Sequence, residues 1–216
     1  MLLRNDLIEV IFVIDASGSM TTSKDDTIGG FNSLIESQKK EPGETLVTSI
    51  FFNNEVKILD ECVNIQNVQP LTEKNYQTGG MTALYDAVGY AIDSVGERLA
   101  DTPEEERPAE VMVVIVTDGY ENASHDYQFK DIKERIERQQ NTYSWKFIFL
   151  GEDIKSVQHA QEMGISKGLT HTYKKVSLDN VYRSVDTVMR DSKMGHMNGY
   201  GYTVQQAANT LDEGVK

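Results

Sequence analysis

Cysteine is nearly absent from the sequence, because Cys62 is the single one in 216 residues. One thiol excludes a disulfide framework and a cysteine-based zinc site, and it is compatible with a reducing compartment. Long apolar runs are absent too, since no stretch approaches the roughly 18 apolar residues that cross a bilayer. Asp6 and Glu9 interrupt the first segment, where a secretion signal needs an apolar core. We therefore expect a cytoplasmic protein without membrane contact.

Basic residues are few as well. The 21 lysines and arginines stand against 34 aspartates and glutamates, which gives a net charge of −13. A field of that sign repels phosphate backbones and anionic lipid, so neither nucleic acid nor a membrane is an expected partner. The rest of the composition, 39% hydrophobic and 25% charged, is that of an ordinary folded protein. The length favours one large domain over two small ones.

Apolar runs alternate with segments of helical period, which is typical of crossover units on a parallel sheet. The short Asn53-Asn54 connection forces its two flanking strands to pair antiparallel at one edge. The continuous apolar run 111–116 belongs in the sheet centre, with helices on both faces. The expected strands are 7–14, 45–52, 56–65, 111–116, 145–150 and 169–173, and the expected helices are 25–39, 84–99, 129–136, 157–163 and 178–189. The pattern predicts an α/β fold, a doubly wound, Rossmann-like, mostly parallel six-stranded sheet with one antiparallel edge strand.

Glycines set the C-terminal part of the sequence apart. Gly195, Gly199 and Gly201 interrupt any regular pattern there. We therefore expect one domain over residues 1–190 and a Gly-rich tail over residues 191–216.

Three oxygen-bearing segments are expected at one edge of the sheet. Asp15-Ala-Ser17-Gly-Ser19 begins where the first strand ends, and ligands of open parallel sheets bind beyond the carboxyl ends of the strands. One carboxylate and two hydroxyls are hard donors of the kind that Mg²⁺ or Ca²⁺ prefers. Thr82 directly precedes the helix 84–99, and Asp118 ends the central strand. Each segment read alone is also compatible with a helix cap or an ordinary turn.

Five polar positions in this order resemble the complete metal-ion-dependent adhesion site (MIDAS) of von Willebrand factor A domains, over about residues 5–190. They are Asp15, Ser17, Ser19, Thr82 and Asp118. Further sequence segments, including Gly29-Gly-Phe-Asn, are similar to those of stand-alone intracellular bacterial members of that family. The resemblance implies that the two serines and either Thr82 or Asp118 bind the metal directly, with Asp15 nearby or bound through water.

The resemblance also implies a cofactor and a class of partner. The expected metal is Mg²⁺, with Ca²⁺ or Mn²⁺ as alternatives, and the expected partner is a protein that presents Asp or Glu, including components of AAA-type ATPase systems. Met81 departs from the small residue that many relatives carry, and we expect its thioether to narrow the ligand-binding face. Glu121 and Asn122 are candidates for hydrogen bonds around the metal ligands, and His125 lies close enough in sequence to reach them.

Binding without catalysis is the favoured function. Two carboxylates and three neutral hydroxyls leave a divalent cation under-neutralised, so that a partner's carboxylate can complete its coordination. The alternative is a Mg²⁺-dependent hydrolase or phosphoryl-transfer enzyme. Against it, the sequence has no G-x-x-x-x-G-K-S/T loop, has Ser17 where an aspartyl-nucleophile phosphatase needs Asp, and does not place Ser17 in the G-x-S-x-G setting of a nucleophile elbow. A third interpretation is an interaction protein in which the metal only stabilises the fold.

Overall fold

A six-stranded sheet forms the centre of the molecule. The computed structural model describes residues 4–173, 178–198 and 206–207. Within them the strand order is β3-β2-β1-β4-β5-β6, and β3 alone runs antiparallel to its neighbour. The strands are β1 (Arg4–Asp15), β2 (Glu44–Phe52), β3 (Val56–Asn64), β4 (Pro108–Thr117), β5 (Lys146–Gly151) and β6 (Thr170–Thr172). The sequence-based prediction of the sheet is confirmed, including the antiparallel edge strand.

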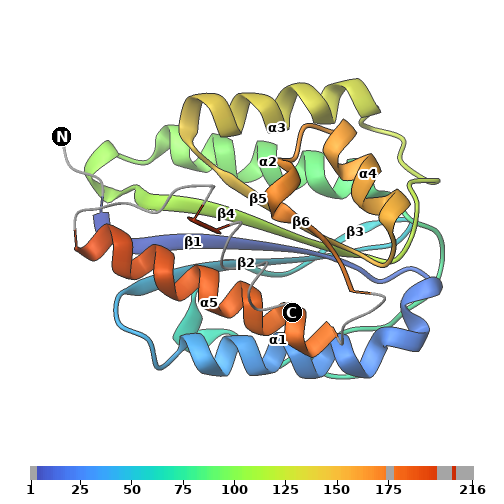
Figure 1. Cartoon of the computed structure of the whole chain (residues 1–216), viewed down its shortest axis with the longest axis horizontal. Coiled ribbons are helices and arrows are strands. Elements are labelled where there is room, and N and C mark those ends of the chain that lie inside the picture. The colour runs from blue at the N-terminus through green and yellow to red at the C-terminus, as the bar shows by residue number, and fades with distance from the viewer. Residues whose placement is uncertain (1–3, 174–177, 199–205, 208–216) are drawn as a thin grey trace.

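Helices cover both faces of the sheet, as Figure 1 shows. α1 (Lys24–Gln38) and α5 (Leu178–Met197) lie on one face, and α2 (Leu84–Asp101), α3 (Phe129–Tyr143) and α4 (Ile154–Glu162) lie on the other. β1 and β4 are therefore covered on both sides, and every residue from Glu110 to Thr117 is buried. This burial explains the continuous apolar run of β4. None of the described helices combines the length and apolar character needed to cross a membrane.

The strand order reverses at β1, and this reversal defines where a ligand can bind. β1 pairs with β2 on one side and with β4 on the other, and Ile14 is the register partner of Val116. The chain therefore leaves the carboxyl ends of β1 and β4 in opposite directions, which opens a crevice between the two strand ends. Asp15 and Thr117 are the last residues of these strands, so the crevice begins at their side chains.

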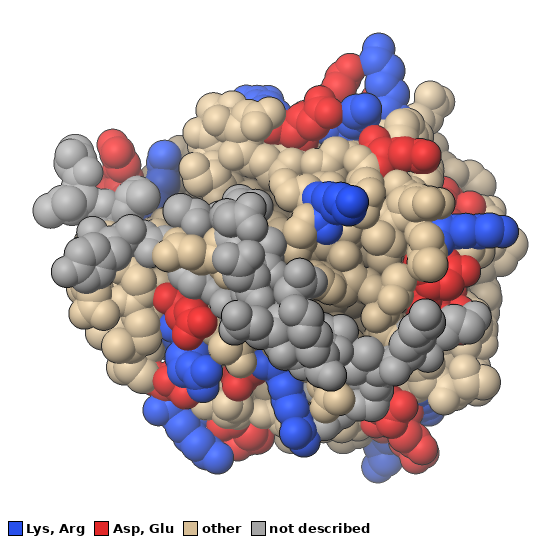
Figure 2. All heavy atoms as spheres, viewed as in Figure 1, with Lys and Arg blue, Asp and Glu red and all other residues tan. Residues whose placement is uncertain are grey.

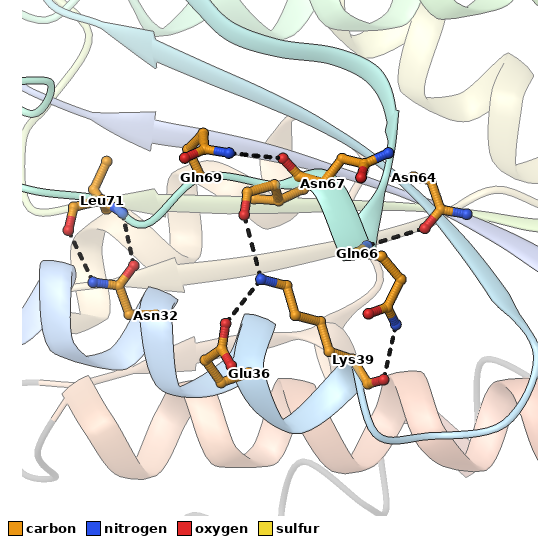
Figure 3. A network of polar contacts seen from close by, with 9 residues as sticks. Asn32, Glu36, Lys39, Asn64, Gln66, Asn67, Gln69 and Leu71 are labelled. Carbon is orange, nitrogen blue, oxygen red and sulfur yellow. Dashed lines mark hydrogen bonds and ion pairs between the residues drawn. The ribbon is translucent and has the colours of Figure 1, made fainter.

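A long connection joins β3 to α2. It lies on the surface of α1 and contains no α-helix. Asn32 of α1 fixes this connection by accepting from Leu71 N–H at 2.7 Å and donating to Leu71 C=O at 2.9 Å. Gln66 donates to the Lys39 carbonyl at 2.8 Å, and Lys39 donates to the Val68 carbonyl at 3.4 Å (Figure 3). These bonds hold the mostly irregular connection against α1, and the loop 78–82 that follows lies at the crevice.

Helix α5 extends beyond the expected end of the domain. It runs to Met197, and Ser192 and Lys193 are buried, so residues 191–197 of the expected tail belong to the folded domain. Gly195 interrupts the sequence pattern there without ending the helix, because helix packing outweighs its cost of about 1 kcal/mol. Of the remaining expected tail, residues 199–205 and 208–216 lie outside the described residues.

Charged side chains of both signs are interspersed on the face shown in Figure 2. Among the described residues visible there, no large patch of one sign stands out.

Candidate metal centre

Side chains from three segments meet at the crevice between β1 and β4. Ser17 Oγ lies 3.0 Å from Ser19 Oγ, and Ser19 Oγ donates to Asp118 Oδ1 at 2.5 Å. Ser17 is buried whereas Ser19 is exposed, so this chain of oxygens runs from the crevice floor to solvent. Residues that are 99 positions apart in sequence are thereby in direct contact. The expected convergence of the first and third segments is present in the structure.

Asp15 forms the buried floor of the site. Its Oδ1 accepts the Ser17 N–H at 2.7 Å, and its Oδ2 accepts the Thr117 hydroxyl at 2.6 Å. Burial raises the pKa of the Asp15 carboxyl above its ordinary value, although these two hydrogen bonds act in the opposite direction. Asp15 therefore orders its own turn, and the first residues of α1 are not capped by a side-chain hydrogen bond.

Thr82 reaches the same point from the opposite loop. A Cβ built on Gly119 would lie 2.7 Å from Thr82 Oγ1 and 3.3 Å from Asp15 Oδ2. A side chain at position 119 would press against these two oxygens, so glycine is what allows Thr82 and Asp15 to approach the same point. The convergence of a hydroxyl and a carboxylate oxygen beside Gly119 is the observation that fits a small cation.

Asp118 supplies the second carboxylate. Partial burial raises the pKa of its carboxyl, the Ser19 hydroxyl lowers it, and the nearby negative charge of Glu152 raises it further. A neighbouring cation would stabilise the ionised Asp118 carboxylate, because its positive charge offsets the cost of burial. The five residues offer oxygen donors alone, the donor type of Mg²⁺, Ca²⁺ and Mn²⁺. The described part of the chain contains no group of three or more His, Cys, Asp or Glu arranged to hold a metal.

Asn122 holds the Thr82 loop in place. Its Oδ1 accepts the Thr82 N–H at 2.9 Å, and its N–H donates to the Thr82 carbonyl at 3.0 Å. The loops that carry Thr82 and Asp118 are therefore joined through backbone and side chain. The sequence-based expectation of a supporting hydrogen bond near the ligands agrees with this geometry.

Glu121 and His125 support the loop without contacting the five oxygen-bearing residues. Glu121 accepts the backbone N–H groups of Tyr85, Ala123 and Ser124 at 2.8 to 3.0 Å. The His125 N–H donates to Asp86 Oδ2 at 2.8 Å. The carboxylates of Glu121 and Asp86 thus bind the loop that follows β4 to the first turn of α2 and orient the main chain around Asp118.

Two further residues position the site and were not found from the sequence. The Tyr76 hydroxyl donates to the Asp15 carbonyl at 2.6 Å, and Asn53 Nδ2 donates to the Gly79 carbonyl at 2.9 Å. Both lie in irregular segments, where hydrophobic periodicity carries no signal. A buried tyrosine needs a partner for its hydroxyl, but the partner is fixed by the topology and not by local sequence.

Comparisons with known proteins identify the fold and the family of the chain. The chain has no match among curated protein sequences. Among solved structures it is similar to a von Willebrand factor type A protein from Catenulispora acidiphila, with 15% identity, a TM-score of 0.57, and coverage of 87% of this chain and 42% of that one. Proximal thread matrix protein 1 from the mussel byssus, with a zinc occupied MIDAS motif, gives 18% identity, a TM-score of 0.54, and coverage of 85% and 46%. The manganese-loaded TRAP protein of Plasmodium vivax gives 16% identity, a TM-score of 0.53, and coverage of 81% and 72%.

These likenesses establish the fold, and the chain spans less than half the length of the first two of these proteins. A sequence model of the von Willebrand factor type A domain matches residues 9–187. Because this match covers most of the chain, the chain belongs to the von Willebrand factor type A domain family.

Proposed function

We propose that the chain is a metal-dependent protein-binding module with a divalent cation at the crevice. The proposal is carried by the contacts of 3.0 and 2.5 Å that join Ser17, Ser19 and Asp118. The approach of Thr82 Oγ1 and Asp15 Oδ2 to the same point beside Gly119 supports it further. The residues that would hold the cation are Asp15, Ser17, Ser19, Thr82 and Asp118.

The partner is proposed to be a protein that presents an Asp or Glu carboxylate. A bound divalent cation supplies a Lewis-acidic point that attracts a hard anionic oxygen. Both carboxylate oxygens of Asp15 already accept hydrogen bonds from protein groups, and Ser19 faces solvent. The exposed side of the site is therefore the side from which a partner's oxygen approaches.

The contacts of Ser17 favour binding over catalysis. Its hydroxyl oxygen lies 3.0 Å from the Ser19 hydroxyl and also interacts with the Asp15 carboxylate. That carboxylate already accepts the Ser17 N–H and the Thr117 hydroxyl, so it holds the turn and is poorly placed to act as a general base. For this reason we propose a non-enzymatic role.

Several finer assignments belong to the same proposal. Mg²⁺ is the proposed metal, with Mn²⁺ or Ca²⁺ as alternatives, and the zinc- and manganese-loaded structures of related fold support a divalent ion of this size. A component of an AAA-type ATPase system is the proposed kind of partner, on the resemblance to intracellular bacterial members. A cytoplasmic location rests on the same resemblance and is tested by cell fractionation.

Calorimetric titration with MgCl₂ tests the proposal. Wild type is expected to bind one Mg²⁺, and Asp118→Ala is expected to lose binding while its thermal unfolding stays cooperative. Asp101→Ala removes an exposed carboxylate at the end of α2 and is the matched control. Equal Mg²⁺ affinity in wild type and Asp118→Ala contradicts the assignment. Turnover of p-nitrophenyl phosphate in MgCl₂ that is lost in Ser17→Ala favours the hydrolase instead.

A further inference from the structure

Three large apolar side chains are exposed around the candidate metal centre. Met81 is 50% exposed, Tyr120 is 49% exposed and Ile154 is 66% exposed. Met81 immediately precedes Thr82, Tyr120 follows Asp118 by two positions, and Ile154 begins α4 after β5. They come from three different loops at the carboxyl edge of the sheet. Met81, Tyr120 and Ile154 are called the apolar rim below.

Hydrogen bonds fix the relative positions of these three loops. The Tyr120 hydroxyl donates to both carboxylate oxygens of Asp153, at 3.2 and 3.0 Å. Asp153 also caps α4 by accepting the Ser156 N–H at 2.9 Å. Tyr120 is therefore tied to the helix end that carries Ile154. The pair of bonds between Asn122 and Thr82 ties the Tyr120 loop to the Met81 loop in turn.

This arrangement is suited to binding an apolar group with little loss of freedom. A tyrosine ring with a fixed hydroxyl needs little further ordering when a partner covers it. A recess of about 370 Å³ gives room for a partner's side chain beside Tyr120, and it is lined also by Tyr85, Glu121, Lys155, Gln158, His159 and Glu162. Exposed Met and Tyr side chains around a polar centre are the composition found in the cores of protein interfaces.

The charge around the rim decides what can flank a partner's carboxylate. Asp153 contacts Tyr120, the carboxylates of Glu121 and Glu162 outnumber the single Lys155 in the lining of the recess, and the chain carries a net charge of −13. Additional acidic residues in the partner would be repelled here, because the cation can neutralise only the one carboxylate that it binds. Apolar neighbours avoid this repulsion and cover the rim.

We propose that the partner's metal-binding Asp or Glu is directly followed by a large apolar side chain, which packs against Met81, Tyr120 and Ile154. The inference rests on the proposed function, because the cation anchors the carboxylate. It adds a second recognition element that a small free carboxylate lacks. The occupant is thus a protein segment with an acidic residue next to a Leu, Ile, Met or Phe.

Two synthetic peptides that differ at one residue test this proposal. Both are flexible Gly/Ser peptides with one central Asp, followed by Leu in one and by Ser in the other. Titrations of the whole chain in saturating MgCl₂, followed by NMR, are expected to give a dissociation constant about tenfold lower for the Asp-Leu peptide, or about 1.4 kcal/mol. Chelator is expected to remove binding of both peptides.

Substitutions in the apolar rim test whether its residues cause the preference for the Asp-Leu peptide. Met81→Ser and Ile154→Ser are expected to remove most of the difference between the peptides and to leave Mg²⁺ affinity unchanged. Tyr120→Phe keeps the ring but loses the bonds to Asp153, so an intermediate difference is expected. Tyr143→Ser is the control, since Tyr143 is 53% exposed at the end of α3, away from the carboxyl edge.

The outcomes separate this inference from the proposed function. Mg²⁺-dependent binding of both peptides with equal affinity overturns the apolar rim and leaves the metal-dependent module intact. A preference for Leu that persists in both serine variants overturns the rim as well. Absence of Mg²⁺-dependent binding by either peptide removes the proposed function and the inference together.

Discussion

The Tyr76 hydroxyl donates a hydrogen bond of 2.6 Å to the backbone carbonyl of Asp15, a residue 61 positions earlier in the chain. Tyr76 is fully buried and belongs to the irregular connection that lies on α1. The bond therefore links that connection to the turn that carries Ser17 and Ser19. The site is therefore held in place by Tyr76, which lies outside the loops that carry the oxygen-bearing residues.

Tyr76→Phe is expected to lower both stability and Mg²⁺ affinity. Loss of the hydroxyl leaves the buried Asp15 carbonyl without this donor, at a cost of about 1 to 3 kcal/mol in the free energy of unfolding. Urea unfolding measures the first effect and calorimetric titration the second. Tyr143→Phe, on an exposed residue, is the control and is expected to change neither. Unchanged unfolding of Tyr76→Phe contradicts the role given to this bond.

Gly119→Ala is expected to abolish metal binding. The new methyl group would lie 2.7 Å from Thr82 Oγ1, inside the space proposed for the cation. Gly29→Ala is a matched control, because a Cβ at Gly29 meets nothing within 4 Å on the exposed side of α1. That control is expected to bind Mg²⁺ as wild type does and to gain up to about 1 kcal/mol of stability. Mg²⁺ binding that survives in Gly119→Ala places the cation elsewhere.

Asn122→Ala is expected to weaken Mg²⁺ binding through Thr82. The substitution removes the side-chain acceptor of the Thr82 N–H and costs about 1 kcal/mol, or roughly fivefold in affinity if the loss falls on the loaded state. Asn122→Asp keeps an oxygen at the same position and is expected to restore affinity. If the aspartate variant binds as weakly as the alanine variant, the hydrogen bond to Thr82 is not the cause.

Glu110 and Lys146 form a buried ion pair at the opposite edge of the sheet, and His196 of α5 binds Glu110 at 2.8 Å. Burial acts to raise the pKa of the Glu110 carboxyl, but His196 and Lys146 outweigh it and the pKa is lowered. A lowered carboxyl pKa stabilises the folded state above the ordinary value near 4.5, and this contribution is lost as the pH falls through the folded-state pKa.

Glu110→Gln is therefore expected to lower stability at pH 7 by about 3 kcal/mol, because the buried Lys146 loses the Glu110 carboxylate that offsets the cost of its burial. The variant is also expected to lose less stability than wild type between pH 5 and pH 3, a window set by the ordinary glutamate value of 4.5. Unfolding midpoints at several pH values measure both effects. Glu105→Gln, an exposed substitution, provides the comparison. Parallel pH profiles for wild type and Glu110→Gln contradict the assignment.

The fold was largely predictable from the sequence, because its central strands are apolar and its helices show an apolar periodicity. Two features show where periodicity fails. Gly195 suggested a break, but it lies within α5, whose helix ends only at Met197. Cys62 sits in an irregular stretch of β3 with a φ of 51°, and its N–H donates to Thr48 Oγ1 at 3.1 Å. Both depend on contacts with distant segments, and local sequence does not encode these contacts.

The positions of the oxygen-bearing residues and the support from Asn122 were predictable from the sequence, but two other supports were not. Ser17 and Asp118 follow strand ends, so the topology alone brings them near each other. Tyr76 and Asn53 donate to backbone carbonyls of distant segments. Every residue has such a carbonyl, so nothing in the sequence indicates which one is bound.

Because β1 is central in the sheet, the turn that follows it is expected to need more free energy to open than the loop that carries Thr82. The Ala16 N–H bonds the Phe52 carbonyl at 2.7 Å inside the sheet, so its hydrogen exchange requires separation of β1 from β2, an event close to global unfolding. Thr82 is buried, but its N–H bonds the exposed Asn122 of another loop and can exchange through a local opening of the two loops. Amide exchange is therefore expected to be far slower at Ala16 than at Thr82, and added Mg²⁺ should slow it at Thr82 alone. The opening of the loops that carry Thr82 and Asp118 then sets the lifetime of the metal complex, while Asp15 keeps its position.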